Sequence, residues 1–195
     1  VDHYGLGPFL AELDPKAMVV GERGMVKPGL RGSSIFMDLG KESSKFISEK
    51  RVQLIFGACE PHLLSLYVGR GSRTFAEKNI CSPEAGYLIP IVNVIEDVEY
   101  LRRIGSPSAG AARDWGEDAR IPDCVESLVS NGGNVMSQRL VDSGLYLGEI
   151  HDALGELAEN HFSVLAGLDE DEAARALGRS NIIRCAAGDR VIKKG

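Results

Sequence analysis

The sequence predicts an α/β protein: a small, mainly parallel sheet in residues 1–105, which carries the candidate site, and then a mostly helical C-terminal half in residues 106–195. Two observations predict this arrangement. In the first half, short apolar runs alternate with helix-like segments, as in parallel strands that are joined by helices. In the second half, apolar residues recur at spacings of three and four, as on one face of a helix. The small, flexible stretch 105–112 marks the boundary.

Four apolar runs are the expected strands. The runs 17–20, 34–37 and 52–58 each end in residues that could bind or react, and the carboxyl ends of parallel strands lie along one edge of a sheet. A fourth run, 87–95, is rich in β-branched residues. Pro90 within it predicts an edge strand or an extended crossing segment rather than a central strand.

Helices are expected between and after these runs. In the first half they occupy 41–50 and 60–68, and Pro61 suits the first turn of the second helix. In the second half we expect helices at 96–105, 124–133, 134–147, 147–168 and 169–178. The segment 147–168 has the clearest apolar stripe. The acidic residues on the opposite side of that segment are Glu149, Asp152, Glu156 and Glu159.

Charge and hydropathy exclude several classes of partner. The chain has 195 residues and a net charge of −6, and residues 96–195 hold 18 acidic but only 11 basic side chains. A basic surface for nucleic acid is therefore not expected. No apolar run approaches the roughly 18 residues that suggest a membrane span, and the amino terminus lacks the basic region of a secretory signal. We accordingly expect a cytoplasmic protein that binds neither nucleic acid nor membrane.

Metal and cofactor sites are not indicated. The four cysteines are too far apart for the close spacing of zinc or redox sites and are expected to be free thiols. A helical diiron site needs Glu-x-x-His, whereas Glu149 and Glu159 each precede a histidine by two residues. The H-E-x-x-H, P-loop and G-x-G-x-x-G patterns are absent as well. No metal and no cofactor is therefore expected.

The sharpest pair of candidate catalytic residues is Cys59 with His62. A cysteine at a strand end, beside the amino terminus of a helix, meets unpaired N–H groups and a positive dipole that favour the thiolate. His62, three residues later, would act as its base or as a hydrogen-bond donor. Two other interpretations stay open: Cys59 contacts a ligand without reacting, or it packs as a small hydrophobic residue.

Asp38 is the third candidate catalytic residue, because it directly follows the expected strand 34–37. At a strand end it would bind a metal, hold a ribose or act as a general base. The alternative is that Asp38 caps the helix that follows, since Ser, Asp and Asn are the usual residues at that position.

A glycine-rich basic loop after the first strand is the candidate substrate-binding segment. Glycines let the backbone approach a ligand, and Arg and Lys donate charge-assisted hydrogen bonds to phosphate or carboxylate. A second stretch of this kind, 69–73, ends the next helix. The residues assigned to this anion site are Gly21, Arg23, Gly24, Lys27, Arg31 and Arg70. A solvent-exposed cluster of turns would have the same composition, so both interpretations stay open.

Two short stretches resemble the smaller domain of class I fumarase and tartrate dehydratase enzymes. Residues 18–25, MVVGERGM, resemble its glycine-methionine loop, and residues 52–59, VQLIFGAC, resemble a following strand. The usual lysine-glycine pair of that loop is replaced by Glu22 and Arg23, and the two stretches lie too far apart. Membership of the family is therefore not inferred, and no residue role is transferred.

These assignments lead to one principal hypothesis and one alternative. The principal hypothesis is a cytoplasmic enzyme of hydrolase or lyase type that binds a small anionic, phosphate- or carboxylate-bearing metabolite at the carboxyl edge of the parallel sheet. The alternative is a non-catalytic subunit or interaction protein. Its acidic helical C-terminal half would dock on a partner or on a second copy, which would form a homo-oligomer.

Overall fold

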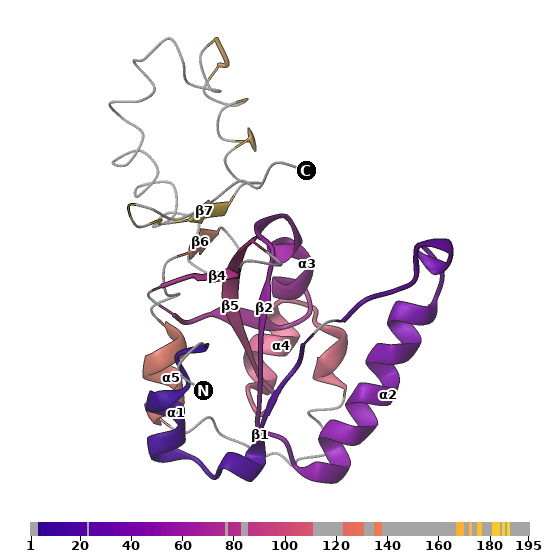
Figure 1. The fold of residues 1–195 in the computed structure, drawn as a ribbon, viewed down its shortest axis with the longest axis vertical. Coiled ribbons are helices and arrows are strands. Elements are labelled where there is room, and N and C mark those ends of the chain that lie inside the picture. The colour runs from indigo at the N-terminus through magenta and orange to yellow at the C-terminus, as the bar shows by residue number, and fades with distance from the viewer. Residues whose placement is uncertain are drawn as a thin grey trace.

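The structure is a computed structural model of the chain, shown in Figure 1. It describes residues 4–22, 24–76, 78–82, 86–110, 123–130 and 135–137, and beyond these only 167–169, 172, 175–176, 181–183, 185 and 187. The described helices are α1 (Gly7–Glu12), α2 (Ile35–Lys50), α3 (Leu64–Val68), α4 (Val98–Arg103) and α5 (Asp123–Ser130). The described strands are β1 (Met18–Val20), β2 (Leu54–Cys59), β3 (Ser72–Thr74), β4 (Ile80–Ser82), β5 (Gly86–Val94), β6 (Val135–Ser137) and β7 (Asn181–Ile183).

Five of these strands form one mixed sheet in the order β1-β2-β5-β3, with β4 also beside β5. In this sheet β1 is parallel to β2, whereas β5 runs antiparallel to β2, β3 and β4. The expectation of a mainly parallel sheet is therefore wrong. Three residues separate β4 from β5, which are too few for a parallel crossover, and β5 inserts between β2 and β3.

The run 34–37 is not a strand, which corrects a second expectation. Ser34 precedes α2, and the three residues after it form the first turn of that helix. The helix therefore begins six residues before the expected segment 41–50. A short apolar run does not by itself distinguish a strand from a helix, and this run continues without a turn signal into a helix-forming sequence.

Pro90 lies in the central strand β5. The strand tolerates this proline because it falls between the part of β5 that pairs with β4 and the part that pairs with β3. The N–H of Ile95 donates to the carbonyl oxygen of Gln53, and antiparallel pairs alternate between bonded and non-bonded. The pair of Pro90 with Ala58 is therefore non-bonded, so the nitrogen of Pro90 points away from β2. On that other side, β4 pairs with β5 before Pro90 and β3 pairs with it after Pro90. The proline thus costs the sheet no hydrogen bond, and the expected edge or crossing segment is a central strand.

The carboxy-terminal half is described only in part, so a mostly helical C-terminal half is not supported. Helix α5 lies where a helix was expected, and it contacts α1. Within the expected helix 134–147, however, residues 135–137 form β6, which pairs antiparallel with β7. The expected helix 147–168 lies outside the described residues except for its last two, and the boundary at 105 stays a prediction.

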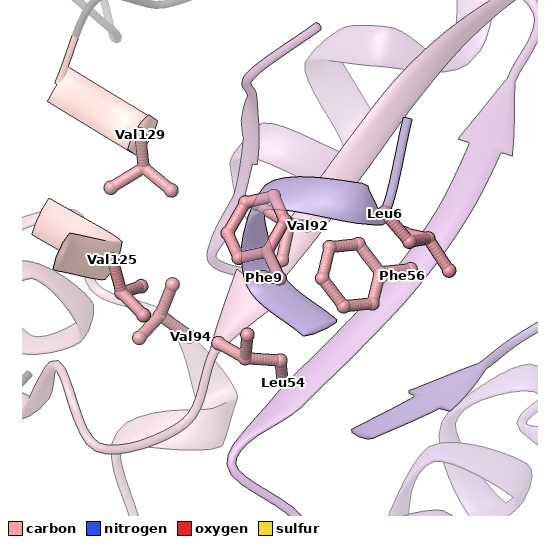
Figure 2. Packing of buried hydrophobic residues seen from close by; sticks show 8 residues of the cluster. All are labelled: Leu6, Phe9, Leu54, Phe56, Val92, Val94, Val125 and Val129. Atoms are coloured by element: carbon pink, nitrogen blue, oxygen red, sulfur yellow. The ribbon is translucent and has the colours of Figure 1, made fainter. Parts of the chain in front are cut away.

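The larger apolar core lies between one face of the sheet and helices α1 and α5 (Figure 2). Phe9 of α1 meets Phe56 of β2 edge to face, with ring centroids 4.9 Å apart. Phe75 packs edge to face against both rings. The buried members of this core are Leu6, Phe9, Leu54, Phe56, Val92, Val94, Val125 and Val129.

The opposite face of the sheet carries a second, smaller core under α3. Successive residues of a strand face opposite sides, so Cys59, Ile89 and Ile91 lie on this side, whereas Phe56 lies on the other. Leu64 of α3 is fully buried against them. Both faces of the central strands are therefore apolar and covered.

Helix α4 is fixed to the sheet by a buried ion pair. Asp97 precedes the helix, and its Oδ1 accepts a hydrogen bond from the backbone N–H of Tyr100 at 3.0 Å. The other oxygen of this carboxylate pairs with the guanidinium of Arg73 in β3, which also lies 3.6 Å from the centre of the Tyr100 ring. Because both charges are largely buried, the loss of either partner would leave the other uncompensated.

Replacing Phe56 by alanine is expected to lower the free energy of unfolding by about 3–5 kcal/mol, because it removes a buried ring from the larger core. Urea denaturation measures the change. Phe46→Ala in α2 is the matched control, since the same atoms are removed from a side chain that is half exposed, and its expected effect is about 0.5 kcal/mol. Equal losses for the two variants would contradict the packing in Figure 2.

Candidate functional site

The carboxyl ends of β1 and β2 form the parallel edge at which the site was expected. Gly21 follows β1, and its N–H donates to the carbonyl oxygen of Phe56 at 2.7 Å. A Cβ at Gly57 would lie 3.2 Å from the carbonyl oxygen of Gly21, so glycine suits this close approach. Cys59 lies three residues beyond Phe56, which is about 10 Å along β2 at the usual rise of a strand. Gly21 and Cys59 therefore share one edge without being neighbours.

Cys59 is a core residue. It is 3% exposed and packs with Leu64 of α3 and Ile89 of β5. Burial, and next the negative charge of Glu60, raise the pKa of its thiol to about 12, whereas a reactive cysteine needs a lowered pKa. A 3-10 turn, Pro61–Leu63, separates it from the five-residue α3. These features favour packing over a nucleophilic role for Cys59.

His62 lies on the surface rather than beside the thiol. Its Nδ1 is 3.2 Å from Oε2 of Glu60, and both side chains are well exposed. An exposed pair of this kind contributes little to stability. The imidazole therefore lies in solvent while the thiol of Cys59 lies in the core.

Asp38 lies in the first turn of α2 and not at a strand end. Its side chain is exposed, it accepts a hydrogen bond from Ser34 Oγ at 2.9 Å, and Lys41 Nζ lies 3.5 Å from its other oxygen. An acidic residue in a first turn interacts favourably with the helix dipole. The helix explains these contacts of Asp38, although the residue is not the N-cap, which is Ser34.

The basic loop between β1 and α2 is exposed. Gly24, Lys27 and Arg31 all lie on the surface, and Nε of Arg31 donates to the carbonyl oxygen of Val26 at 3.4 Å. Arg23, the remaining cation assigned to this loop, lies outside the described residues. The described part of the loop thus presents positive charge to solvent.

The guanidinium of Arg70 lies against α2. A Cβ at Gly40 would come within 2.6 Å of Nη2 of Arg70, so the guanidinium occupies the room that a glycine leaves on the helix. The carbonyl oxygen of Arg70 accepts hydrogen bonds from Ser106 Oγ at 2.5 Å and from Asn93 Nδ2 at 3.4 Å. Arg70 therefore ties α2 to the rest of the fold.

Helix α2 carries large apolar side chains that are exposed to solvent. Among the residues of α2 whose burial the structure describes, the half-buried ones are Gly40, Ser44, Ile47 and Ser48. Its outward side carries the apolar residues Ile35, Leu39 and Phe46, which are spaced four and seven positions apart and therefore share one face. They are 40%, 50% and 49% exposed. We call these three residues the stripe.

The stripe belongs to a longer exposed segment. Residues 20–51, which we call the excursion, run from the end of β1 through the basic loop and α2, and Figure 1 shows α2 standing to one side of the sheet. Val20, Met25 and Leu30 of the excursion are also exposed. The spacing of the stripe is visible in the sequence, but it would ordinarily predict a face turned toward the core. Only the structure shows that it faces solvent.

Within the described residues, neither a membrane-spanning helix nor a cluster of metal ligands is found. No helix among them combines the length and the apolar character that a membrane crossing requires. In the same part of the chain, no three histidine, cysteine or acidic side chains gather as metal ligands would. The excursion is therefore the candidate binding surface of the described residues, because most of their exposed large apolar side chains lie in it.

The raised pKa of Cys59 predicts a protected thiol. Iodoacetamide at pH 8 is expected to modify the exposed Cys81 and Cys185 while Cys59 stays unmodified until the protein unfolds, because only the thiolate reacts and burial also blocks access. Mass spectrometry of the labelled peptides, with and without urea, measures this difference. Labelling of Cys59 in the native protein as rapid as that of Cys81 would restore the nucleophile hypothesis.

Comparisons with family models, with curated proteins and with solved structures found no match. No residue role therefore comes to this chain from a relative. The two stretches that resemble class I fumarases stay an isolated likeness.

Proposed function

We propose that this chain is a non-catalytic binding protein that docks an acidic protein surface against the excursion. The observation that carries the proposal is the concentration of exposed apolar side chains. Of the eight large apolar residues that are exposed among the described residues, six lie between Val20 and Phe46. Single exposed apolar residues are ordinary, but a concentration of this kind is typical of a surface that binds a partner.

The charge of the excursion indicates the chemistry of that partner. It contains seven basic and four acidic side chains, so its net charge is +3 within a chain of −6, and the remainder of the chain is −9. A locally positive surface attracts an acidic partner and repels a basic one. Together with the stripe, this charge favours a partner that is both apolar and acidic.

The construction of α2 supports docking through the stripe. Its half-buried side is held by the contact of Arg70 with Gly40, which leaves Ile35, Leu39 and Phe46 turned outward. Residues at such spacings are the anchors by which an amphipathic helix binds an apolar groove. The interaction hypothesis from the sequence relied instead on the acidic C-terminal half, most of which lies outside the described residues.

A second candidate is the binding of a small anion, as expected from the sequence. The observation that favours it is the positive charge of the basic loop, where Lys27 and Arg31 are exposed. Local positive charge raises the concentration of an anion near the surface. This candidate covers the binding of phosphate or carboxylate rather than hydrolase or lyase chemistry, because Cys59 is buried with a raised pKa.

Substitution of the stripe tests the docking proposal. Leu39→Glu places a charge on the stripe and is expected to weaken binding of a captured partner by roughly thirtyfold, as for a central interface residue. Leu66→Glu in α3 is the matched control, because Leu66 is 47% exposed, close to the 50% of Leu39, but lies outside the excursion. Co-purification followed by quantitative binding measures both. If Leu66→Glu reduces binding as much as Leu39→Glu does, the proposal is wrong.

Titration with inorganic phosphate tests the second candidate. The double variant Lys27→Gln and Arg31→Gln is expected to lose phosphate binding, since two charge-assisted contacts disappear. Lys16→Gln, an exposed lysine outside the excursion, serves as the control and should leave binding unchanged. Isothermal titration calorimetry provides the affinities, and equal phosphate affinities for the wild type and the double variant would exclude this candidate.

A further inference from the structure

We propose that Cys81 and Cys185 form a reversible disulfide, which fastens the chain after β7 to the five-stranded sheet when the protein meets a hydroperoxide. The inference is independent of the docking proposal, since neither cysteine lies in the excursion. Both thiols are free and exposed, whereas the free thiol of Cys59 is buried. More than half of the chain separates the two cysteines in sequence, so the fold has to bring them together.

Tyr87 is the neighbour that the two cysteines share. In β4, Cys81 lies directly opposite Tyr87 of β5. The nitrogen of Pro90 points away from β2, so the alternation along β5 turns the backbone of Tyr87 toward β2 and makes its pair with Cys81 a non-bonded one. The two Cα atoms of such a pair lie only about 4.5 Å apart, and their side chains share one face of the sheet. Cys81 therefore lies beside the base of the Tyr87 side chain.

Cys185 lies at the other end of that side chain. Its Sγ is 3.2 Å from the hydroxyl oxygen of Tyr87, which is a hydrogen-bond distance for sulfur. Asn79 Nδ2 donates to the same oxygen, and the hydroxyl can still donate its own proton to the sulfur. Tyr87 belongs to the smaller core and is 4% exposed, so its hydroxyl is held in place. One tyrosine side chain and one hydrogen bond thus span the separation between the two thiols.

Strand β7 holds Cys185 near this face of the five-stranded sheet. Ile183 packs against the smaller core, and Asn181 Nδ2 donates to Ser65 Oγ of α3 at 3.4 Å. Figure 1 shows β6 and β7 beyond the end of the sheet at which β4 lies. A disulfide needs its two Cα atoms within about 7 Å. Cys185 comes two residues after β7, so it can approach Cys81 without breaking the pairing of β7 with β6.

A hydroperoxide such as hydrogen peroxide supplies the oxidation. One thiolate attacks the peroxide, so that an S–O bond forms and the O–O bond breaks. The sulfur is oxidised to a sulfenic acid, and the departing oxygen takes up the proton that the thiol released. The thiolate of the other cysteine then attacks this sulfur. The S–S bond forms, the S–O bond breaks, and the hydroxide that leaves takes up the second proton as water. A dithiol reverses the bond by thiol–disulfide exchange.

Treatment of the reduced, full-length chain with hydrogen peroxide tests this inference. Alkylation, digestion without reductant and mass spectrometry are expected to find the peptides of Cys81 and Cys185 linked, and dithiothreitol to release them. Cys81→Ser and Cys185→Ser are each expected to lose the linkage. Cys124→Ser is the matched control, because it removes a cysteine but leaves both partners in place, and it should form the linkage as the wild type does. A native chain that forms no disulfide, or that links either cysteine to Cys59 or Cys124 instead, overturns the inference.

Comparison of the native and the unfolded chain distinguishes a pair that the fold brings together from a chance pairing of exposed thiols. In glutathione buffers, the equilibrium constant for the bond between Cys81 and Cys185 is expected to be at least about tenfold larger in the native protein than in urea. The same mass spectrometry measures the linked fraction in both states. Equal constants in the two states overturn the inference.

Discussion

Strand β2 runs antiparallel to β5 through six residue pairs, from Leu54 with Val94 to Cys59 with Ile89, and the rest of the described fold is arranged around this pairing. Strand β1 adds to β2 on one side, and β3 and β4 add to β5 on the other. Because side chains alternate along both strands, the same pairing provides one face for the core under α1 and α5 and the other for the core under α3. A shift by one residue would exchange the two faces.

Much of this arrangement is predictable from the sequence, and the failures have physical causes. The expected runs 17–20, 52–58 and 87–95 overlap β1, β2 and β5, and the helices α3, α4 and α5 lie within or close to segments where helices were expected. The direction of β5 is not local information, because it depends on which strands it separates. The run at Ile35 illustrates a different limit: helix and strand both accept a short apolar run, and only its continuation into α2 decides.

The sequence likewise predicts part of the candidate site and misses the rest. The sequence places Cys59 correctly at the end of a strand but cannot show on which face its thiol lies, and that face is a core. It places basic residues in an exposed loop, as the structure finds for Lys27 and Arg31. The exposure of Ile35, Leu39 and Phe46 escapes prediction because their spacing on α2 is the same whether that face is buried or exposed.

The position of Pro90 also limits the addition of strands from other molecules to the sheet. Since the nitrogen of Pro90 faces the gap between β3 and β4, the outer border of β5 is covered by two strands of three residues each instead of one long strand. The opposite border, β1, is equally short. Short, interrupted borders present few consecutive free backbone groups, so they are poor templates for adding a foreign strand and forming fibres. Backbone pairing with another molecule is thereby disfavoured at both borders of the sheet.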